Sequence, residues 1–261
     1  MTRVAVGIEY DGSAYAGWQA QASLPTVQQV TERALGAVAA EPVSLVAAGR
    51  TDAGVHACGQ VAHFDTGVDR RARSWILGAN TELPRDVSVS WARTVPAHFH
   101  ARYSAEARTY HYLIANRLAR SALAASRAVW VHRPLDHERM AAAARALEGE
   151  HDFSAFRAAE CQARSPIRRI ERIEVERHGE WIVIAVTANA FLHHMMRNIA
   201  GLLIEIGKGE APIGWAAEVL AERDRRRNAA TAPAAGLYLR SVRYPGAFGL
   251  PAARAAAVLP A

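Results

Sequence analysis

Hydrophobic and polar positions in the N-terminal part of the chain follow two repeating patterns. Residues 3–10 alternate with a period of two and are rich in β-branched side chains, which predicts a strand. After Thr26, a residue suited to cap a helix, apolar residues recur at spacings of three and four, which predicts an amphipathic helix. The same criteria predict strands at 43–48, 60–65 and 87–95 and a second helix at 70–79. The predicted order is therefore β-α-β-β-α-β.

The second half of the chain repeats this pattern of elements without repeating the residues. The predicted strands are 109–115, 167–176, 181–188 and 237–244, and the predicted helices are 137–147, 193–206 and 213–222. We therefore expect an α+β fold of two ferredoxin-like or RRM-like lobes, 1–105 and 106–245, joined through an extended, mostly antiparallel sheet with a central cleft. Such a surface suits RNA.

Weak periodicity predicts irregular structure elsewhere. It fades at 119–126 and 158–164, which indicates long loops. Residues 246–261 are rich in proline and alanine and are expected to form a loosely attached tail.

Composition excludes several classes of protein. Hydrophobic residues make up 51% of the chain and charged residues 21%, a balance typical of a folded protein with a sizeable core. The apolar run 199–204 ends at Glu205, far short of the roughly 20 residues of a membrane span, so we expect no membrane partner. The chain begins without the apolar region of a secretion signal, which predicts a cytoplasmic location. Cys58 and Cys161 are then expected to be free thiols.

The charge favours a polyanionic partner. The formal net charge is +6, and Lys208 is the only lysine among 31 basic residues, so almost every cation is an arginine. Guanidinium groups bind phosphates in bidentate geometry and stack on bases. The arginine-rich runs 164–172 and 223–227 are candidates for phosphate contacts along an RNA, with solvated surface faces as the equal alternative.

The stretch Gly49–Ala57, GRTDAGVHA, carries the most informative chemistry. It lies between two predicted strands and places Asp52 in a turn, with Arg50 two residues earlier and directed to the same side if the backbone is extended. A neighbouring guanidinium favours the ionised form of a carboxyl group. An ionised, fixed carboxylate can act as a nucleophile or a general base. The alternative is that Asp52 only closes a tight Asp-Ala-Gly turn.

All nine residues of this stretch match the signature of a known family, and GRTDAGVHA therefore resembles the TruA family of tRNA pseudouridine synthases. Further matching strings occur in the expected order across residues 1–245. They are IEYDG at 8–12, GWQ at 17–19, Gln28, GQVAHFD at 59–65, FHAR at 99–102, RTY at 108–110, HDF at 151–153, FR at 156–157, NAFLHHMMRN at 189–198 and GLYL at 236–239.

The resemblance implies an isomerase that converts uridine to pseudouridine at positions 38–40 of the tRNA anticodon stem-loop. It implies that Asp52 is the nucleophile, that the target base is flipped out of its stack, and that the uracil turns over and rejoins the sugar through carbon. Arg50 would flip or hold the substrate, Tyr110 would lie against the uracil ring, and Arg197 would pair with the nucleophile. It also implies a tRNA partner and a homodimer.

Two of these residues keep simpler alternatives. Arg50 is otherwise a surface ion-pair partner, and Tyr110 is otherwise an inward-facing residue of a strand.

No cofactor and no metal are expected. The isomerisation oxidises nothing, and the sequence has no phosphate-binding or dinucleotide-binding glycine motif. His193 and His194 are adjacent, so on a helix their side chains point about 100° apart and do not readily share an ion. His98 and His100 have no nearby carboxylate or cysteine to complete a site. A serine hydrolase is equally disfavoured, because no G-x-S-x-G motif occurs.

Two rival functions remain from the sequence. One is a non-catalytic RNA-binding module that acts as a tRNA chaperone, and the other is a synthase for a different RNA. Asp52 favours an enzyme, because a binding module has no physical need for an ionised carboxylate that faces a phosphate-rich ligand. The sequence leaves open the preferred uridine, attack at the sugar or at the base, the dimer interface and the role of Cys58, for which a small packing residue is the expected answer.

Overall fold

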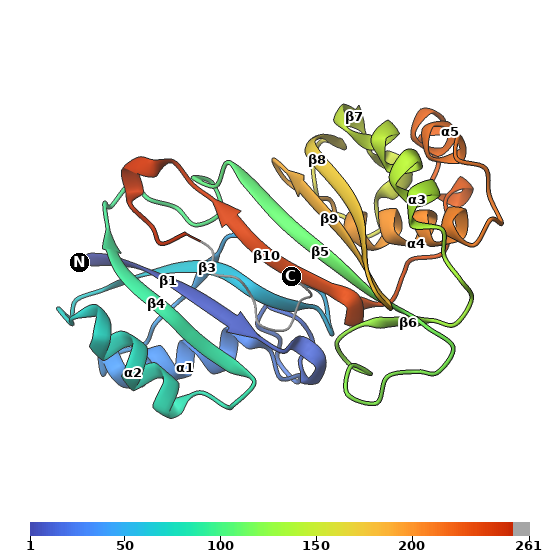
Figure 1. The fold of residues 1–261 in the computed structure, drawn as a ribbon. Helices are drawn as coiled ribbons and strands as arrows, with labels where there is room; N and C mark the ends of the chain where they lie inside the picture. Colours follow the sequence, from blue (N-terminus) through green and yellow to red (C-terminus); the bar gives the residue numbers. More distant parts are fainter. Residues whose placement is uncertain (253–261) are drawn as a thin grey trace. The chain divides into compact units, whose positions relative to one another are not determined.

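The computed structural model describes residues 1–252 and divides the chain into two compact units. The first unit comprises residues 1–106 and the returning segment from Tyr238, and the second comprises residues 107–237. Figure 1 shows the elements of each unit in chain order. No helix within the described residues is long and apolar enough to cross a membrane.

The first unit is built on a sheet whose central strands are antiparallel. The strands are β4 (Val87–Val95), β1 (Thr2–Tyr10) and β3 (His56–Thr66) in that spatial order, with β2 (Val46–Ala47) and β10 (Leu237–Arg243) both on the far edge of β3. β10 runs parallel to β3, with Tyr238 opposite His56. The first four strands in sequence therefore have the spatial order expected of a ferredoxin-like lobe.

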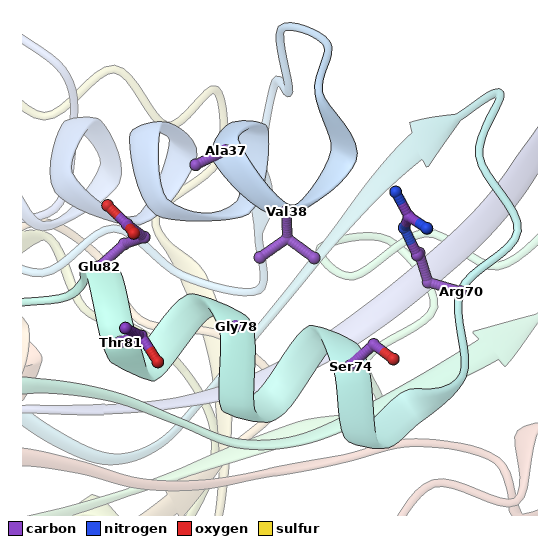
Figure 2. Close-up of a pocket in the computed structure, with 7 residues that line it drawn as sticks. All are labelled: Ala37, Val38, Arg70, Ser74, Gly78, Thr81 and Glu82. Carbon is purple, nitrogen blue, oxygen red and sulfur yellow. The ribbon is translucent and has the colours of Figure 1, made fainter.

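Two helices, α1 (Val27–Ala39) and α2 (Ala72–Glu82), cover one face of this sheet (Figure 1). The predicted cap is confirmed, because the Thr26 hydroxyl accepts a hydrogen bond from the backbone N–H of Gln29. The helices approach closely at Gly78, where a Cβ would lie 2.7 Å from a methyl group of Val38. An open groove runs between them (Figure 2) and is lined by Ala37, Val38, Arg70, Ser74, Gly78, Thr81 and Glu82.

The other face of this sheet carries a second apolar cluster that includes the segment after β10. Its buried members are Ala5, Ala48, Val61, Val95, Phe99 and Ala101, and Trp91, Val242, Tyr244, Phe248 and Leu250 pack against them. The ring of Phe248 packs edge-on against Phe99 at a centroid distance of 5.0 Å. The prediction of a loose tail is therefore wrong for residues 246–250, because burial of two apolar side chains holds them. The part of that prediction on 253–261 lies outside the described residues.

The second unit has its own antiparallel sheet with helices packed on it. The strand order is β5 (Ala107–Asn116), β9 (Trp181–Ala188), β8 (Ile167–His178) and β7 (Gly149–Asp152), and β6 (Val129–Val131) pairs in parallel with the end of β5. The helices are α3 (His137–Ala144), α4 (Met195–Gly207) and α5 (Trp215–Glu222). Almost every residue of α4 is buried, which makes it the core helix of this unit.

The predicted α+β class is confirmed, and strands 87–95 and 181–188 have the predicted bounds. The predicted loops 119–126 and 158–164 contain no helix or strand. Two short strands, β6 and β7, were not predicted, because three or four residues are too few to show a period. The joining of the lobes through a shared sheet and the cleft between them stay predictions.

Candidate active site

Asp52 begins a tight turn in the loop between β2 and β3. The backbone N–H of Val55 donates to the carbonyl oxygen of Asp52 at 3.1 Å, and Gly54, the third residue of the turn, has a φ of +77°. A turn with a positive φ at this position favours glycine there. Asp52 itself is only partly buried. The Asp-Ala-Gly turn expected from the sequence is therefore real, and it presents the carboxylate on a short, fixed segment.

A neighbouring segment of backbone holds this turn in place. The N–H of Trp18 donates to the carbonyl oxygen of Thr51 at 3.0 Å, and the N–H of Gly54 donates to the carbonyl oxygen of Tyr15 at 3.3 Å. Gly17 lies between these contacts with a φ of +94°, so close to the turn that a Cβ would lie 2.6 Å from the Thr51 carbonyl oxygen. The segment that carries the GWQ string therefore supports the turn that carries Asp52.

Buried side chains support the turn from the sheet. The hydroxyl groups of Tyr10 and Thr51 are 2.8 Å apart, and both residues are buried. Burial raises the pKa of Tyr10 above its usual value, so the phenol is neutral and can donate. The side-chain amide of Gln60, which is fully buried, donates to the carbonyl oxygen of Gly49 at 2.7 Å. Sequence reasoning did not assign these residues a role, although Tyr10 and Gln60 lie in matched strings.

His56 fixes the other end of the loop. The N–H of Gly12 donates to its Nδ1 at 3.1 Å, and an oxygen of the Asp11 carboxylate lies 3.2 Å from the same nitrogen. The imidazole stacks on the ring of Tyr238 at a centroid distance of 4.7 Å. Three matched strings that are far apart in the sequence, IEYDG, GRTDAGVHA and GLYL, therefore meet around this loop.

Arg50 lies two residues before Asp52 in the same loop and is exposed. Within residues 1–252 its side chain has no hydrogen bond or ion pair, so the alternative of a surface ion-pair partner receives no support. A guanidinium group beside the turn is placed to meet an anionic ligand.

Tyr110 lies on β5 of the second unit and is 9% exposed. Its ring packs edge-on against Phe191, with a centroid distance of 4.8 Å and an interplanar angle of 70°. Tyr110 therefore packs as the simpler alternative from the sequence predicts, as an inward-facing residue of a strand. This burial is also compatible with a ring that covers a planar substrate with its remaining surface.

Arg197 lies in the first turn of α4. Its Nε donates to the carbonyl oxygen of Ala232 at 2.8 Å, which fixes the orientation of the guanidinium group. The helix begins at Met195 rather than at His193, because His194 adopts a left-handed conformation with a φ of +62°. This bend is a structural feature that helical periodicity alone does not predict.

A buried polar network anchors the same turn of α4. Asn198 is fully buried, and its amide donates to the carbonyl oxygen of Phe156 at 2.7 Å. Its side-chain oxygen accepts hydrogen bonds from Arg225 at 3.0 Å and from the hydroxyl of Thr231 at 2.7 Å. Burial lowers the pKa of Arg225. One arginine of the 223–227 run is therefore part of the scaffold that positions Arg197.

The structure thus brings Arg50 and Asp52 together in one loop of the first unit and places Tyr110 and Arg197 in the second unit. The meeting of the two pairs at one site stays a prediction.

Comparison with known proteins identifies the family. A family model described as tRNA pseudouridine synthase matches residues 7–104 and 143–245, which include the Asp52 turn, β10 and the first turn of α4. The chain belongs to this family. The resemblance drawn from GRTDAGVHA is confirmed.

Named relatives extend over nearly the whole chain. The tRNA pseudouridine synthase A of Pseudomonas aeruginosa is 56% identical over 252 residues, which cover 96% of this chain and 88% of the relative. That of Methylococcus capsulatus is 56% identical over 248 residues, with 95% and 92% covered. That of Legionella pneumophila is 52% identical over 248 residues, with 95% of each covered.

Family membership makes the chain an isomerase that acts on tRNA and converts uridine to pseudouridine. The prediction of an enzyme is therefore confirmed. The chaperone alternative does not fit this membership.

Proposed function

We propose that the enzyme isomerises uridines at positions 38–40 of the tRNA anticodon stem-loop, with Asp52 as the nucleophile and the target base flipped out of its stack. The observation that carries the proposal is the support of the Asp52 turn by Tyr15, Gly17 and Trp18. A nucleophile contributes most when its position is fixed before the substrate arrives.

The proposed chemistry needs only a carboxylate. Asp52 donates an electron pair to the sugar or the base ring of the flipped uridine, and the bond between the sugar and the ring nitrogen breaks. The uracil then turns over, the sugar bonds to C5, the bond to Asp52 breaks to regenerate the carboxylate, and the hydrogen of C5 leaves as a proton to solvent water. Atoms and electrons balance without an oxidant, a reductant or a cofactor.

The other three residues bind the substrate in this proposal. Arg50 holds the flipped nucleotide through its phosphate or base, because its guanidinium group is exposed beside the turn. Tyr110 lies against the uracil ring. Arg197, with its Nε held by Ala232, pairs with the Asp52 carboxylate through its terminal nitrogens.

The proposal extends to assembly and location. A homodimer that holds one tRNA across paired surfaces is expected, and sedimentation of the free protein and of its tRNA complex measures both stoichiometries. We also predict that the protein is located in the cytoplasm.

A substrate series tests the position of the target. Three anticodon stem-loop RNAs, each with a single uridine at position 38, 39 or 40, are incubated with the wild type and with Asp52→Asn, and pseudouridine is measured in the digested RNA. We expect product from the wild type only. Product at another position of full-length tRNA, with none from the three stem-loops, contradicts the proposed target. Product from Asp52→Asn contradicts the proposed nucleophile.

A further inference from the structure

An exposed aromatic stack lies on the loop that follows β4, in the first unit. The rings of His100 and Tyr103 are 4.3 Å apart between centroids and inclined by only 30°. Tyr103 is 76% exposed, the largest exposed fraction of any tryptophan, tyrosine or phenylalanine in residues 1–252. The guanidinium carbon of Arg102 lies 5.6 Å from the centre of the Tyr103 ring, within the range of a cation–π contact.

Short-range hydrogen bonds fix the shape of this loop. The Nδ1 of His100 accepts from the backbone N–H groups of Arg102 and Tyr103, each at 3.2 Å. The N–H of His100 donates to the hydroxyl of Ser104 at 3.0 Å, and the N–H of Ser104 donates back to the carbonyl oxygen of His100 at 2.8 Å. The loop is therefore ordered before any ligand binds, which lowers the entropy cost of binding.

The loop is also attached to the core of its unit. The N–H of Ala101 donates to Nδ1 of His63 at 3.1 Å, and the hydroxyl of Tyr244 donates to the carbonyl oxygen of Ala101 at 2.6 Å. Phe99, immediately before His100, is completely buried. An aromatic side chain held outward on such a base is not explained by packing.

One arginine, Arg102, lies at the stack, and a second, Arg3, lies beneath it and is paired with Asp65. Burial and the nearby charges of Arg3 and Arg102 lower the pKa of His100, which keeps its imidazole neutral and able to accept the two N–H groups. Arg3 lies beneath the loop and donates to the carbonyl oxygens of Ala97 and Phe99. A flat aromatic face beside the guanidinium group of Arg102 suits a nucleobase attached to a phosphate.

We propose that His100, Arg102 and Tyr103, here called the Tyr103 platform, bind an unpaired nucleobase of the tRNA substrate outside the catalytic centre. The base stacks on the outer face of the Tyr103 ring, and Arg102 neutralises the adjoining phosphate. The proposal rests on the proposed function only in taking tRNA as the ligand. An RNA base is favoured over a protein partner because the chain carries a net charge of +6 and acts on tRNA.

Substitution of Tyr103 tests the stacking. We expect Tyr103→Ala to weaken tRNA binding by about 5- to 150-fold, the loss typical of one base–aromatic stack. Tyr103→Phe keeps the ring and is expected to bind as the wild type does, whereas Tyr103→Leu is expected to bind weakly. The rate at saturating tRNA should stay unchanged in all three. Leu123→Ala is the control, because Leu123 is an apolar residue that is 94% exposed and has no ring to stack on a base. Unchanged affinity in Tyr103→Ala overturns the proposal.

A combined series identifies the base. tRNAs with a single abasic nucleotide at each unpaired position are bound to the wild type and to Tyr103→Ala. When the abasic nucleotide is at the stacked position, the wild type and Tyr103→Ala should bind the tRNA with the same affinity, because neither can form the stack. An equal difference on every abasic tRNA overturns the proposal, since Tyr103 would then act only through the loop. Arg102→Ala should reduce the slope of log affinity against log salt by about one, while Tyr103→Ala should leave it unchanged.

The same measurements separate this proposal from the proposed function. If the stem-loop series yields no pseudouridine but Tyr103→Ala still weakens binding at one base, the proposed target fails and the platform stands. If the stem-loops react and Tyr103 has no effect on binding, the platform alone fails.

Discussion

Gly17 lies against the backbone of Asp52, where a Cβ would stand 3.0 Å from the carbonyl carbon of Asp52. The φ of Gly17 is +94°, so its conformation also disfavours a side chain. The position of the Asp52 turn is thus set by a segment that comes earlier in the sequence, with α1 and β2 between the two.

Gly17→Ala should therefore lower the catalytic rate by more than its loss of folding stability accounts for. The matched control is Gly179→Ala, because Gly179 also has a positive φ, +61°, but nothing lies within 4 Å of the Cβ that would be added. Both variants carry backbone strain, of order 1–3 kcal/mol. Only Gly17→Ala should displace the turn and lower the single-turnover rate, by about 10- to 100-fold, with tRNA affinity retained. Equal rates in the two variants would count against the role of Gly17.

The long periodic elements could be predicted from the sequence because their apolar faces follow the period of a helix or strand. Residues 87–95 and 181–188 are examples, since buried side chains recur at alternate positions over part of each strand, at 87 and 89 and at 182, 184, 186 and 188. The parallel pairing of β10 with β3 could not be predicted, because it joins segments about 180 residues apart and no local pattern encodes it. The fixed segment 246–250 escaped prediction for the same reason.

The candidate site was predicted from residue identity rather than from periodicity. GRTDAGVHA singled out Asp52 and Arg50, which lie in the loop between β2 and β3, and their roles stay predictions. Tyr10 contacts Thr51, and Gly17 contacts the turn, only because the chain folds back on itself. The matched strings give these residues and their order along the chain, but not which of them touch. The roles of Tyr110 and Arg197 stay predictions.

The hydrogen bond between Tyr10 and Thr51 should stabilise the folded protein. Tyr10→Phe removes the phenol hydroxyl, and Thr51→Val removes the threonine hydroxyl. Each variant leaves the remaining buried hydroxyl without this partner and should lower the free energy of unfolding by about 1–3 kcal/mol. Because the two groups share one bond, the double variant should lose less than the sum of the single losses. Urea unfolding of the four proteins measures this coupling. Strict additivity would show that the bond contributes nothing.

Two arginines of the 223–227 run should differ in how much they contribute to stability. Arg225 donates to Asn198, Thr231 and two carbonyl oxygens, so Arg225→Ala should lower the melting temperature by several degrees. Arg226 has an 89% exposed side chain and pairs with Asp224, so Arg226→Ala should leave the melting temperature nearly unchanged. Thermal unfolding of both variants decides this. Similar melting temperatures would contradict the structural role of Arg225.

His63 should make the first unit less stable in mild acid. Burial, with the charges of Arg3 and His100, lowers the pKa of His63 to about 4 in the folded protein, against about 6.5 in an unfolded chain. Between these values the unfolded chain binds more protons, so the free energy of unfolding should fall as the pH drops from about 6.5 toward 4.

His63→Asn provides the comparison for this pH dependence. Asparagine does not titrate and offers an oxygen that can accept the N–H of Ala101, which Nδ1 of His63 accepts in the wild type. Urea midpoints at pH 7 and pH 5 should therefore differ more for the wild type than for His63→Asn. The same loss of stability in both proteins would show that other groups cause it.

Release of tritium from C5 of labelled uridine in tRNA tests the central claim, because formation of the new carbon bond expels that hydrogen. The wild type, Asp52→Asn and Asp65→Asn are compared, with tRNA affinity measured in parallel. Asp65 is a carboxylate of the same unit that pairs with Arg3, so it controls for the loss of a negative charge. We expect release by the wild type and Asp65→Asn, and none by Asp52→Asn at nearly unchanged affinity. Release by Asp52→Asn at the wild-type rate would contradict the account.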